Sequence, residues 1–122
     1  MGATKQITKP KIVTYEIKPS GDYIKIRADL QGKFAGELYA REVDSGQTLF
    51  ITGLDVPIEY RQRGIASQMN ALLIAFARAH DYKLLFCTIG CNDEIMKSIM
   101  FSKGFFLLTR AGTTLYYYQN LP

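Results

Sequence analysis

The sequence is poor in the residues that build metal sites and disulfides. It contains two cysteines, Cys87 and Cys91, and one histidine, His80. A zinc site needs about four such ligands, so this set is too small to form one. Cys87 lies in an apolar run that is typical of a buried strand, and we therefore expect both thiols to stay reduced in a cytoplasmic protein. His80 is expected to end a helix, where a cation complements the helix dipole.

Long apolar runs and the common nucleotide motifs are also absent. No run approaches the ~20 apolar residues that a membrane-spanning helix needs. Residues 1–11 are polar, carry three lysines and lack the apolar centre of a secretory signal. Neither G-x-G-x-x-G nor G-x-x-x-x-G-K-[ST] occurs. These absences argue against a membrane span, a dinucleotide fold and a P-loop, and they favour a cytoplasmic location.

The rest of the composition is that of an ordinary globular protein. Of 122 residues, 48% are hydrophobic and 21% are charged, and the net charge is +4 at pH 7. A chain of this length can bury a core without disulfides or metals. Because no repeat, low-complexity tract or linker divides it, we expect one domain over residues 1–122, with residues 1–10 flexible. The mild positive charge permits an anionic cosubstrate without requiring nucleic acid.

Hydrophobic periodicity predicts an antiparallel first half and a mixed second half. We expect strands at 11–18, 23–30, 33–43, 47–56, 84–89, 105–109 and 114–118, and helices at 64–80 and 92–103. The strand at 47–56 is apolar on both faces, which favours a central position. The strand–helix–strand order from 47 to 89 predicts a right-handed crossover and a parallel pair. The fold class is therefore α+β: a mixed, mostly antiparallel sheet of about seven strands with helices on its faces.

Residues 56–67, VPIEYRQRGIAS, are an unusual way to begin a helix. Arg61 and Arg63 stand where the helix dipole prefers acids, and no Ser, Thr, Asp or Asn between Glu59 and Gly64 can cap the first turn. That turn leaves about four N–H groups without partners, and Gly64 has no Cβ to keep another group away. Free N–H donors beside two guanidinium groups would suit a diphosphate. The alternative is a solvated arginine pair next to Glu59.

Residues 61–66, RQRGIA, resemble the acyl-CoA loop [QR]-x-x-G-x-[GA] of the GNAT superfamily of N-acetyltransferases. An apolar strand ending in LDV at 54–56 precedes the loop and an amphipathic helix follows it. Asn92 and the GFF at 104–106 then come in the family's order. The chain is thus identified as a minimal member of this superfamily, on a resemblance that covers about residues 47–110. The resemblance implies a splayed pair of central strands with acetyl-CoA, the cosubstrate, in the gap.

The resemblance also implies which residues bind acetyl-CoA. They are Leu54, Val56, Arg61, Gln62, Arg63, Gly64, Ile65, Ala66, Ser67 and Asn92. The backbone of Leu54 and Val56 would pair with the pantetheine arm, and the amides of residues 62–67 would hold the pyrophosphate with the two arginines as charged support. Asn92 would reach the pantetheine from the far side, unless the family's asparagine aligns with Asp93.

The family's usual acid and base have no counterpart here. Many members place a proton-donating tyrosine four residues before the GF glycine, where this chain has Met100. The strand segment 48–52 also lacks the glutamate that often serves as the base. Since many relatives work by proximity and water relays, these gaps weaken the residue assignments more than the activity.

Two residues are the catalytic candidates, Asp55 and Tyr116. Asp55 and Glu37 are the carboxylates nearest in sequence to the expected cleft, and Asp55 could instead face solvent or a turn. Tyr116, Tyr117 and Tyr118 could each present a hydroxyl from the last strand. Because their directions alternate, at least one should pack in the core.

The acceptor site is expected to be open. Relatives insert one or two helices between the first two strands, whereas only residues 19–22 separate them here. The leading prediction is therefore an N-acetyltransferase that moves acetyl to a primary amine, favouring a protein over a small molecule, by direct attack in a ternary complex. The alternative is an inert CoA-binding sensor or interaction module, supported by Met100. A nucleic-acid binder using Tyr23, Lys25 and Arg27 is disfavoured by the modest charge.

The helix at 64–80 is apolar beyond its main stripe, at Ala71, Ile74 and Ala75. Self-association or cover by the final hairpin would each explain this excess. We favour a homodimer slightly over the second explanation.

Overall fold

The computed structural model describes residues 12–121, so the flexibility predicted for residues 1–10 lies outside the described residues. The elements are β1 (Val13–Ser20), β2 (Tyr23–Leu30), β3 (Lys33–Val43), η1 (Asp44–Gly46), β4 (Thr48–Asp55), η2 (Ile58–Tyr60), α1 (Ile65–Ala79), β5 (Leu84–Gly90), α2 (Glu94–Ser102), β6 (Phe106–Ala111) and β7 (Thr114–Asn120). Every strand and helix expected from the sequence is present, in the expected order.

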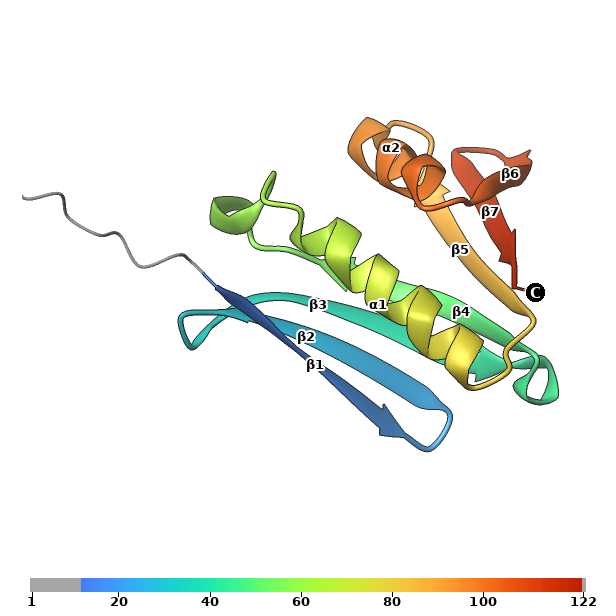
Figure 1. The fold of residues 1–122 in the computed structure, drawn as a ribbon. Coiled ribbons are helices and arrows are strands. Elements are labelled where there is room, and N and C mark those ends of the chain that lie inside the picture. Colours follow the sequence, from blue (N-terminus) through green and yellow to red (C-terminus); the bar gives the residue numbers. More distant parts are fainter. Residues whose placement is uncertain (1–11, 122) are drawn as a thin grey trace, which may run out of the picture.

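The seven strands form one sheet in the order β1-β2-β3-β4-β5-β7-β6 (Figure 1). Neighbouring strands are antiparallel except β4 and β5, which are parallel and are joined through α1. β4 lies in the middle of this order, as its two apolar faces predicted. The predicted α+β class, with a mixed and mostly antiparallel sheet, is confirmed.

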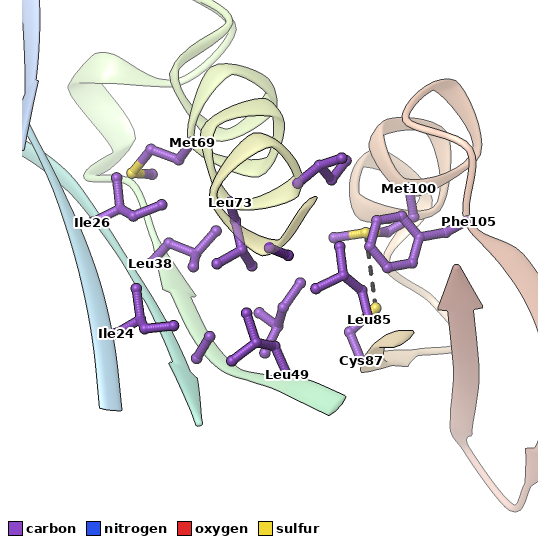
Figure 2. Packing of buried hydrophobic residues seen from close by; sticks show 14 of the residues in the cluster. Ile24, Ile26, Leu38, Leu49, Met69, Leu73, Leu85, Cys87, Met100 and Phe105 are labelled. Atoms are coloured by element: carbon purple, nitrogen blue, oxygen red, sulfur yellow. Dashed lines mark hydrogen bonds between the residues drawn. The ribbon is translucent and has the colours of Figure 1, made fainter. Parts of the chain in front are cut away.

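Both helices pack on the same face of the sheet rather than on opposite faces (Figure 2). α1 lies against β2, β3 and β4, with Met69 and Leu73 pointing into the cluster. α2 places Met100 against Cys87 of β5. These four side chains are at most 2% exposed. One continuous apolar cluster therefore fixes both helices to the sheet.

The opposite face has no helix over it in the part of the chain that the structure describes. An aromatic row crosses the parallel strand pair on this face: the Phe50 and Phe86 ring centres are 5.2 Å apart, and those of Phe86 and Tyr116 are 5.9 Å apart. These rings are half-buried, whereas their neighbours Leu85 and Cys87 are fully buried under the helices. The sheet thus keeps one broad, partly aromatic surface open.

The turn between β1 and β2 is shorter than the sequence predicted. The pattern indicated a turn over residues 19–22, but β1 continues, and Pro19 pairs with Ile24. Proline is tolerated there because β1 is an edge strand, where its missing N–H breaks no ladder. Only Gly21, with φ +61°, and Asp22 remain to form the turn. No helix between these strands covers the open face.

The apolar excess on α1 is partly covered within the chain. Ile74 is 8% exposed and belongs to the main cluster, Ala71 is half-buried, and Ala75 is exposed. The off-stripe residues therefore leave little free apolar surface on α1. The reason for expecting a homodimer through this helix falls away.

Neither helix in residues 12–121 is long and apolar enough to cross a membrane. Within the same residues, no three metal-binding side chains come together. Cys87 is buried and Cys91 is half-buried, and both are free thiols.

Candidate functional site

The central strands β4 and β5 pair only over their first halves. Their parallel ladder begins at Thr48 and stops at Ile51, which lies opposite Cys87. Beyond this point β4 continues to Asp55 along β3, and β5 continues to Gly90 along β7. The two strands therefore diverge, and the splayed pair expected from the sequence is confirmed.

A β-bulge in β4 lies where the strands part. Tyr39 of β3 pairs with Gly53, while the next residue, Ala40, pairs with Ile51, so Thr52 is an extra residue. The Thr52 hydroxyl donates to the Tyr39 carbonyl at 3.4 Å. A bulge bends its strand and increases the local twist, and this one accompanies the departure of β4 from β5. A glycine inside a strand pattern is the sequence signal for a bulge, and Gly53 could have predicted it.

The diverging strands enclose a cleft of about 280 Å³. Its walls come from the far halves of β4 and β5, and α2 contributes to it as well. The lining residues are Phe50, Ile51, Thr52, Gly53, Leu54, Cys87, Thr88, Ile89, Gly90, Asp93, Met96 and Met100. Because the β4–β5 ladder stops at Ile51, the side of each strand that faces the cleft has no strand partner there in the described chain, and its backbone groups are available to a polar ligand.

The loop before α1 leads into a helix start that has no side-chain cap. The N-cap residue is Gly64, with φ +79°, and no cap hydrogen bond is present. The first helical bond runs from the Gln68 N–H to the Gly64 carbonyl at 2.9 Å. Among the described residues, the amides of residues 65–67 find no acceptor. Gln62 also has a left-handed backbone, with φ +63°, and a Cβ at Gly64 would meet nothing within 4 Å. The helix start therefore has unpaired N–H groups and open space beside Gly64.

The two loop arginines differ in their contacts. Arg61 Nε donates to the Val56 carbonyl at 2.8 Å, which ties the two ends of the loop together. The Arg63 guanidinium lies 5.6 Å from the centre of the Tyr60 ring. Both arginines remain exposed at the positive end of α1. The Val56 carbonyl, expected to pair with pantetheine, already accepts one bond and keeps its second lone pair.

At the start of α2, Asp93 rather than Asn92 lines the cleft. The Asp93 carboxylate caps α2 by accepting the Met96 N–H at 3.0 Å. Asn92 is exposed, and its side-chain oxygen accepts a weak bond from the Cys91 thiol at 3.8 Å. The residue at the cleft is therefore Asp93, the alternative to Asn92 that the sequence analysis named.

Besides Asp93, two carboxylates lie near the site, Asp55 and Glu37, and they are cross-strand partners. Glu37 forms an ion pair with Lys25 at 2.8 Å. The Lys25 ammonium, helped by the Tyr39 hydroxyl and opposed by desolvation, holds the pKa of Glu37 below its ordinary value. Asp55 is exposed and has no ion-pair partner in the described chain. Neither carboxylate lines the cleft itself.

Tyr116 lies one strand away from the cleft. It pairs with Thr88, a lining residue, and its ring is near that of Phe86 on the open face. Tyr117 points the other way and is 8% exposed, so the prediction that one of these tyrosines packs in the core is confirmed. Tyr118 is half-buried. Tyr116 and Tyr117 are each in register with a lining residue, Thr88 and Cys87, and of these two tyrosines Tyr116 is the less buried.

Two sulfur-containing side chains, Met100 and Cys87, line the part of the cleft where many relatives have a proton-donating tyrosine. Met100 is 1% exposed, and the Cys87 thiol donates to its sulfur at 3.8 Å. Burial raises the pKa of Cys87 to about 12, so this group is a neutral thiol and no nucleophile at pH 7. The tyrosine of many relatives is thus replaced by a buried, aprotic side chain.

Thr88 lines the cleft, whereas His80 lies at the end of α1. Thr88 is an exposed lining residue that the sequence reasoning missed, although a lone threonine in an otherwise apolar strand end was a visible signal. His80 ends α1, donates from Nδ1 to the Phe76 carbonyl at 3.0 Å, and stacks on the Phe76 ring at 4.0 Å. These contacts give His80 a structural role.

Comparison with known proteins gives the same fold. A sequence profile described as "Acetyltransferase (GNAT) family" matches residues 4–98. No curated protein matches the sequence significantly. Among solved structures, IAA acetyltransferase from Bacillus cereus has a TM-score of 0.76 and 13% identity, over 90% of this chain and 100% of that one. The ribosomal-protein-S18-alanine N-acetyltransferase of Escherichia coli has a TM-score of 0.76 and 14% identity, over 84% and 72% of the two chains.

The PaiA N-acetyltransferase of Thermoplasma acidophilum, solved with coenzyme A, has a TM-score of 0.75 and 11% identity, over 81% of this chain and 61% of that one. The chain spans less than two thirds of the length of several such structures. At these identities the structural likeness shows the fold, while the profile match covers most of the sequence. The family uses acetyl-CoA, and the resemblance seen in the sequence is confirmed. This chain belongs to the GNAT family of acetyltransferases.

Proposed function

We propose that this protein is an N-acetyltransferase that moves the acetyl group of acetyl-CoA to a primary amine on another protein. The observation that carries the proposal is the cleft between β4 and β5 together with the uncapped start of α1. A strand-like polar arm fits the first feature and a diphosphate fits the second, and coenzyme A has both.

The loop and the helix start fit a diphosphate in charge and in shape. Three N–H groups at residues 65–67 are free, and the space in front of Gly64 is open. A bound anion would satisfy these donors and would complement the helix dipole. Arg61 and Arg63 would add positive charge at the same end, Arg61 while also holding the loop through Val56.

The cleft would hold the pantetheine arm beside the unpaired edge of β4 at Leu54, with Asp93 and Thr88 on the other side. In the ternary complex, the amine nitrogen attacks the thioester carbonyl carbon, the C–N bond forms and the C–S bond breaks. The amine loses a proton and the departing sulfur gains one. The contribution of the chain is chiefly to position the two reactants.

The two residues at the inner end of the cleft, Met100 and Cys87, are unsuited to transfer these protons. Met100 cannot donate, and Cys87 keeps its proton because burial raises its pKa to about 12. We assign the base to Asp55, acting through water, because it has no ion-pair partner in the described chain, whereas Lys25 compensates Glu37. Tyr116, in register with Thr88, is the hydroxyl assigned to the departing sulfur.

A protein acceptor is supported by the open face. The β1–β2 turn contains only Gly21 and Asp22, so no helix there shapes a closed pocket over the sheet. Asp55, the cross-strand partner of Glu37, has no ion-pair partner in the described chain and would attract an ammonium group. An exposed lysine or chain N-terminus can reach such a shallow site, whereas a small metabolite would have few walls to contact.

A second candidate, a CoA-binding sensor without turnover, is favoured by one observation. The residue pair at the inner cleft, Met100 and Cys87, is buried and has no acid that titrates near neutral pH. A protein that only reports on CoA levels would need the loop and cleft but not the proton routes.

One experiment separates these functions. The protein is incubated with acetyl-CoA and either a cell lysate or small polyamines, and released CoA is measured by chromatography while acetylated proteins are identified by mass spectrometry. Protein acetylation that is lost in Arg61→Ala supports the proposal. Binding without turnover on any acceptor favours the sensor, and efficient acetylation of polyamines alone overturns the protein acceptor. No binding of acetyl-CoA by the wild-type chain contradicts both functions.

We also place this activity in the cytoplasm. Two free thiols, Cys87 and Cys91, suit a reducing compartment. Fractionation of cells that express the protein would test the location.

A further inference from the structure

Four aromatic side chains form one row across the open face of the sheet. Phe50 of β4 pairs with Phe86 of β5, Phe86 pairs with Tyr118 of β7, and Tyr118 pairs with Phe106 of β6. Because cross-strand partners point to the same face, the four rings lie on one surface. The ring centres of Phe50 and Phe86 are 5.2 Å apart, and those of Phe106 and Tyr118 are 6.1 Å apart. We call these four residues the aromatic platform.

No helix of the described residues covers the aromatic platform. Both helices pack on the other face of the sheet (Figure 2). Phe106 is 61% exposed, and the other three platform residues are half-buried. Isolated exposed apolar residues are ordinary in soluble proteins, but a continuous apolar surface marks a binding site. The platform is therefore a candidate surface for recognition.

The platform is continuous with the cleft between β4 and β5. Phe50 is itself one of the residues that line the cleft. The β4–β5 ladder ends at Ile51, one residue beyond Phe50, so the platform lies where the strands part. Thr88, another lining residue, is two residues along β5 from Phe86, a distance of about 6.6 Å. A molecule with one group in the cleft can therefore rest a neighbouring group on the platform.

The charges on this face favour an uncharged group on the platform. None of the four platform residues is charged. The cations on the adjoining strands β2 and β3 each have an acid beside them: Lys25 has Glu37 at 2.8 Å, Arg27 has Asp29 at 3.1 Å, and Arg41 has Asp22 at 3.6 Å. Since these pairs compensate one another, little positive charge is left to bind the phosphates of a nucleic acid. A flat, uncharged aromatic surface suits a large apolar side chain, and above all another aromatic ring.

We propose that the acceptor protein carries a large apolar side chain, preferably an aromatic one, next to the residue whose amine is acetylated. This inference rests on the proposed function, because it names the sequence around the acceptor amine. The amine would enter the cleft, and the neighbouring side chain would pack on Phe50 and Phe86. Such packing would let a shallow, open face select among the many amines that proteins expose.

The test uses pentapeptides of sequence AXKXA, in which X is phenylalanine, alanine or glutamate. Each peptide has a free N-terminus and one lysine, and both amines have X in the next residue. Released CoA gives kcat/KM in the presence of acetyl-CoA, and NMR titration of the full chain gives Kd without turnover. We expect the phenylalanine peptide to be favoured over the alanine peptide by about fourfold to tenfold in both measurements, because the platform contacts only one side of the added ring. The amide shifts should gather on the platform and the cleft.

Two variants remove a platform ring, Phe86→Thr and Tyr118→Thr. Threonine keeps a high strand propensity, and circular dichroism of each variant checks its folding, so the test does not depend on one variant alone. Tyr23→Thr is the matched control, since Tyr23 is 43% exposed and lies on the same face, on β2, outside the platform. The preference for the phenylalanine peptide should fall toward one in both platform variants and should persist in Tyr23→Thr.

The two assays separate failure of this inference from failure of the proposed function. Equal Kd values for the phenylalanine and alanine peptides would overturn the inference, even if both peptides are acetylated. A preference that survives in both platform variants, or that is lost equally in Tyr23→Thr, would also overturn it. Preferred binding of the phenylalanine peptide on the platform without any acetylation would contradict the proposed function and support the platform as a peptide site.

Discussion

Replacing Gly64 by alanine should weaken acetyl-CoA binding far more than it weakens the fold. Gly64 has φ +79°, and an added Cβ would meet nothing within 4 Å. Folding therefore loses only the cost of a left-handed non-glycine residue, about 1–2 kcal/mol. In the complex, the new methyl group would occupy the open space beside the helix start, where the pyrophosphate is expected to bind. A hydrogen bond to a charged group contributes about 1.5–3 kcal/mol, so losing one raises Kd about tenfold to a hundredfold.

Gly21→Ala is the matched control for this change. Gly21 also has a left-handed backbone, with φ +61°, and a Cβ added there would likewise meet nothing within 4 Å. It lies in the β1–β2 turn, at the other end of the sheet from the loop (Figure 1). Both variants should melt a few degrees below the wild type, and only Gly64→Ala should change Kd.

Isothermal titration with acetyl-CoA gives Kd, and chromatographic measurement of released CoA gives kcat and KM. We expect Gly64→Ala to raise KM with a smaller effect on kcat, since the pyrophosphate contact is made equally in the ground and transition states. Wild-type affinity in Gly64→Ala would refute the reasoning. So would an equal loss of affinity in Gly21→Ala, because strain alone would then explain the effect.

Three further predictions follow from burial and charge. Iodoacetamide should modify Cys91 and spare Cys87 in the native protein, because burial raises the pKa of Cys87 to about 12; mass spectrometry that finds Cys87 modified first would contradict this. The pKa of Glu37 lies below its ordinary value of 4.5 because of Lys25, so Glu37 contributes stability above that pH, and this stability is lost as the pH falls through the lowered pKa. Urea midpoints should therefore fall less on acidification in Glu37→Gln than in the wild type, and equal falls would argue against the ion pair. Leu73→Ala, at a position 0% exposed, should cost about 2–5 kcal/mol in urea unfolding, and a cost below about 1 kcal/mol would contradict the described core.

The order and type of the elements could be predicted from the sequence because each has a clear period. In β2, Ile24, Ile26, Ala28 and Leu30 alternate with polar residues, and all four are buried. Position in the sheet also followed, since a strand apolar on both faces can only be central. The helix start at Gly64 was predictable as a binding loop because its residues contradict the ordinary preferences for a helix N-terminus.

Features that depend on register could not be predicted in the same way. Gly53 signals a bulge, but its exact position at Thr52 is defined only by the register with β3. The first residue of α2 follows from the Asp93 cap, whose hydrogen bond to the Met96 N–H places Asn92 outside the helix. The sharing of one face by both helices, and hence the open aromatic face, depends on which way the crossovers pack.

The placement of acetyl-CoA is tested most directly by the backbone amides themselves. A chain of 13.8 kDa is well suited to solution NMR, and a titration with acetyl-CoA reports on every amide at once. The largest shifts should fall on Ile65, Ala66 and Ser67, with smaller ones along β4 at Leu54. Shifts that leave residues 65–67 unchanged and gather elsewhere, for example on β6, would contradict the proposed binding of the pyrophosphate at the start of α1.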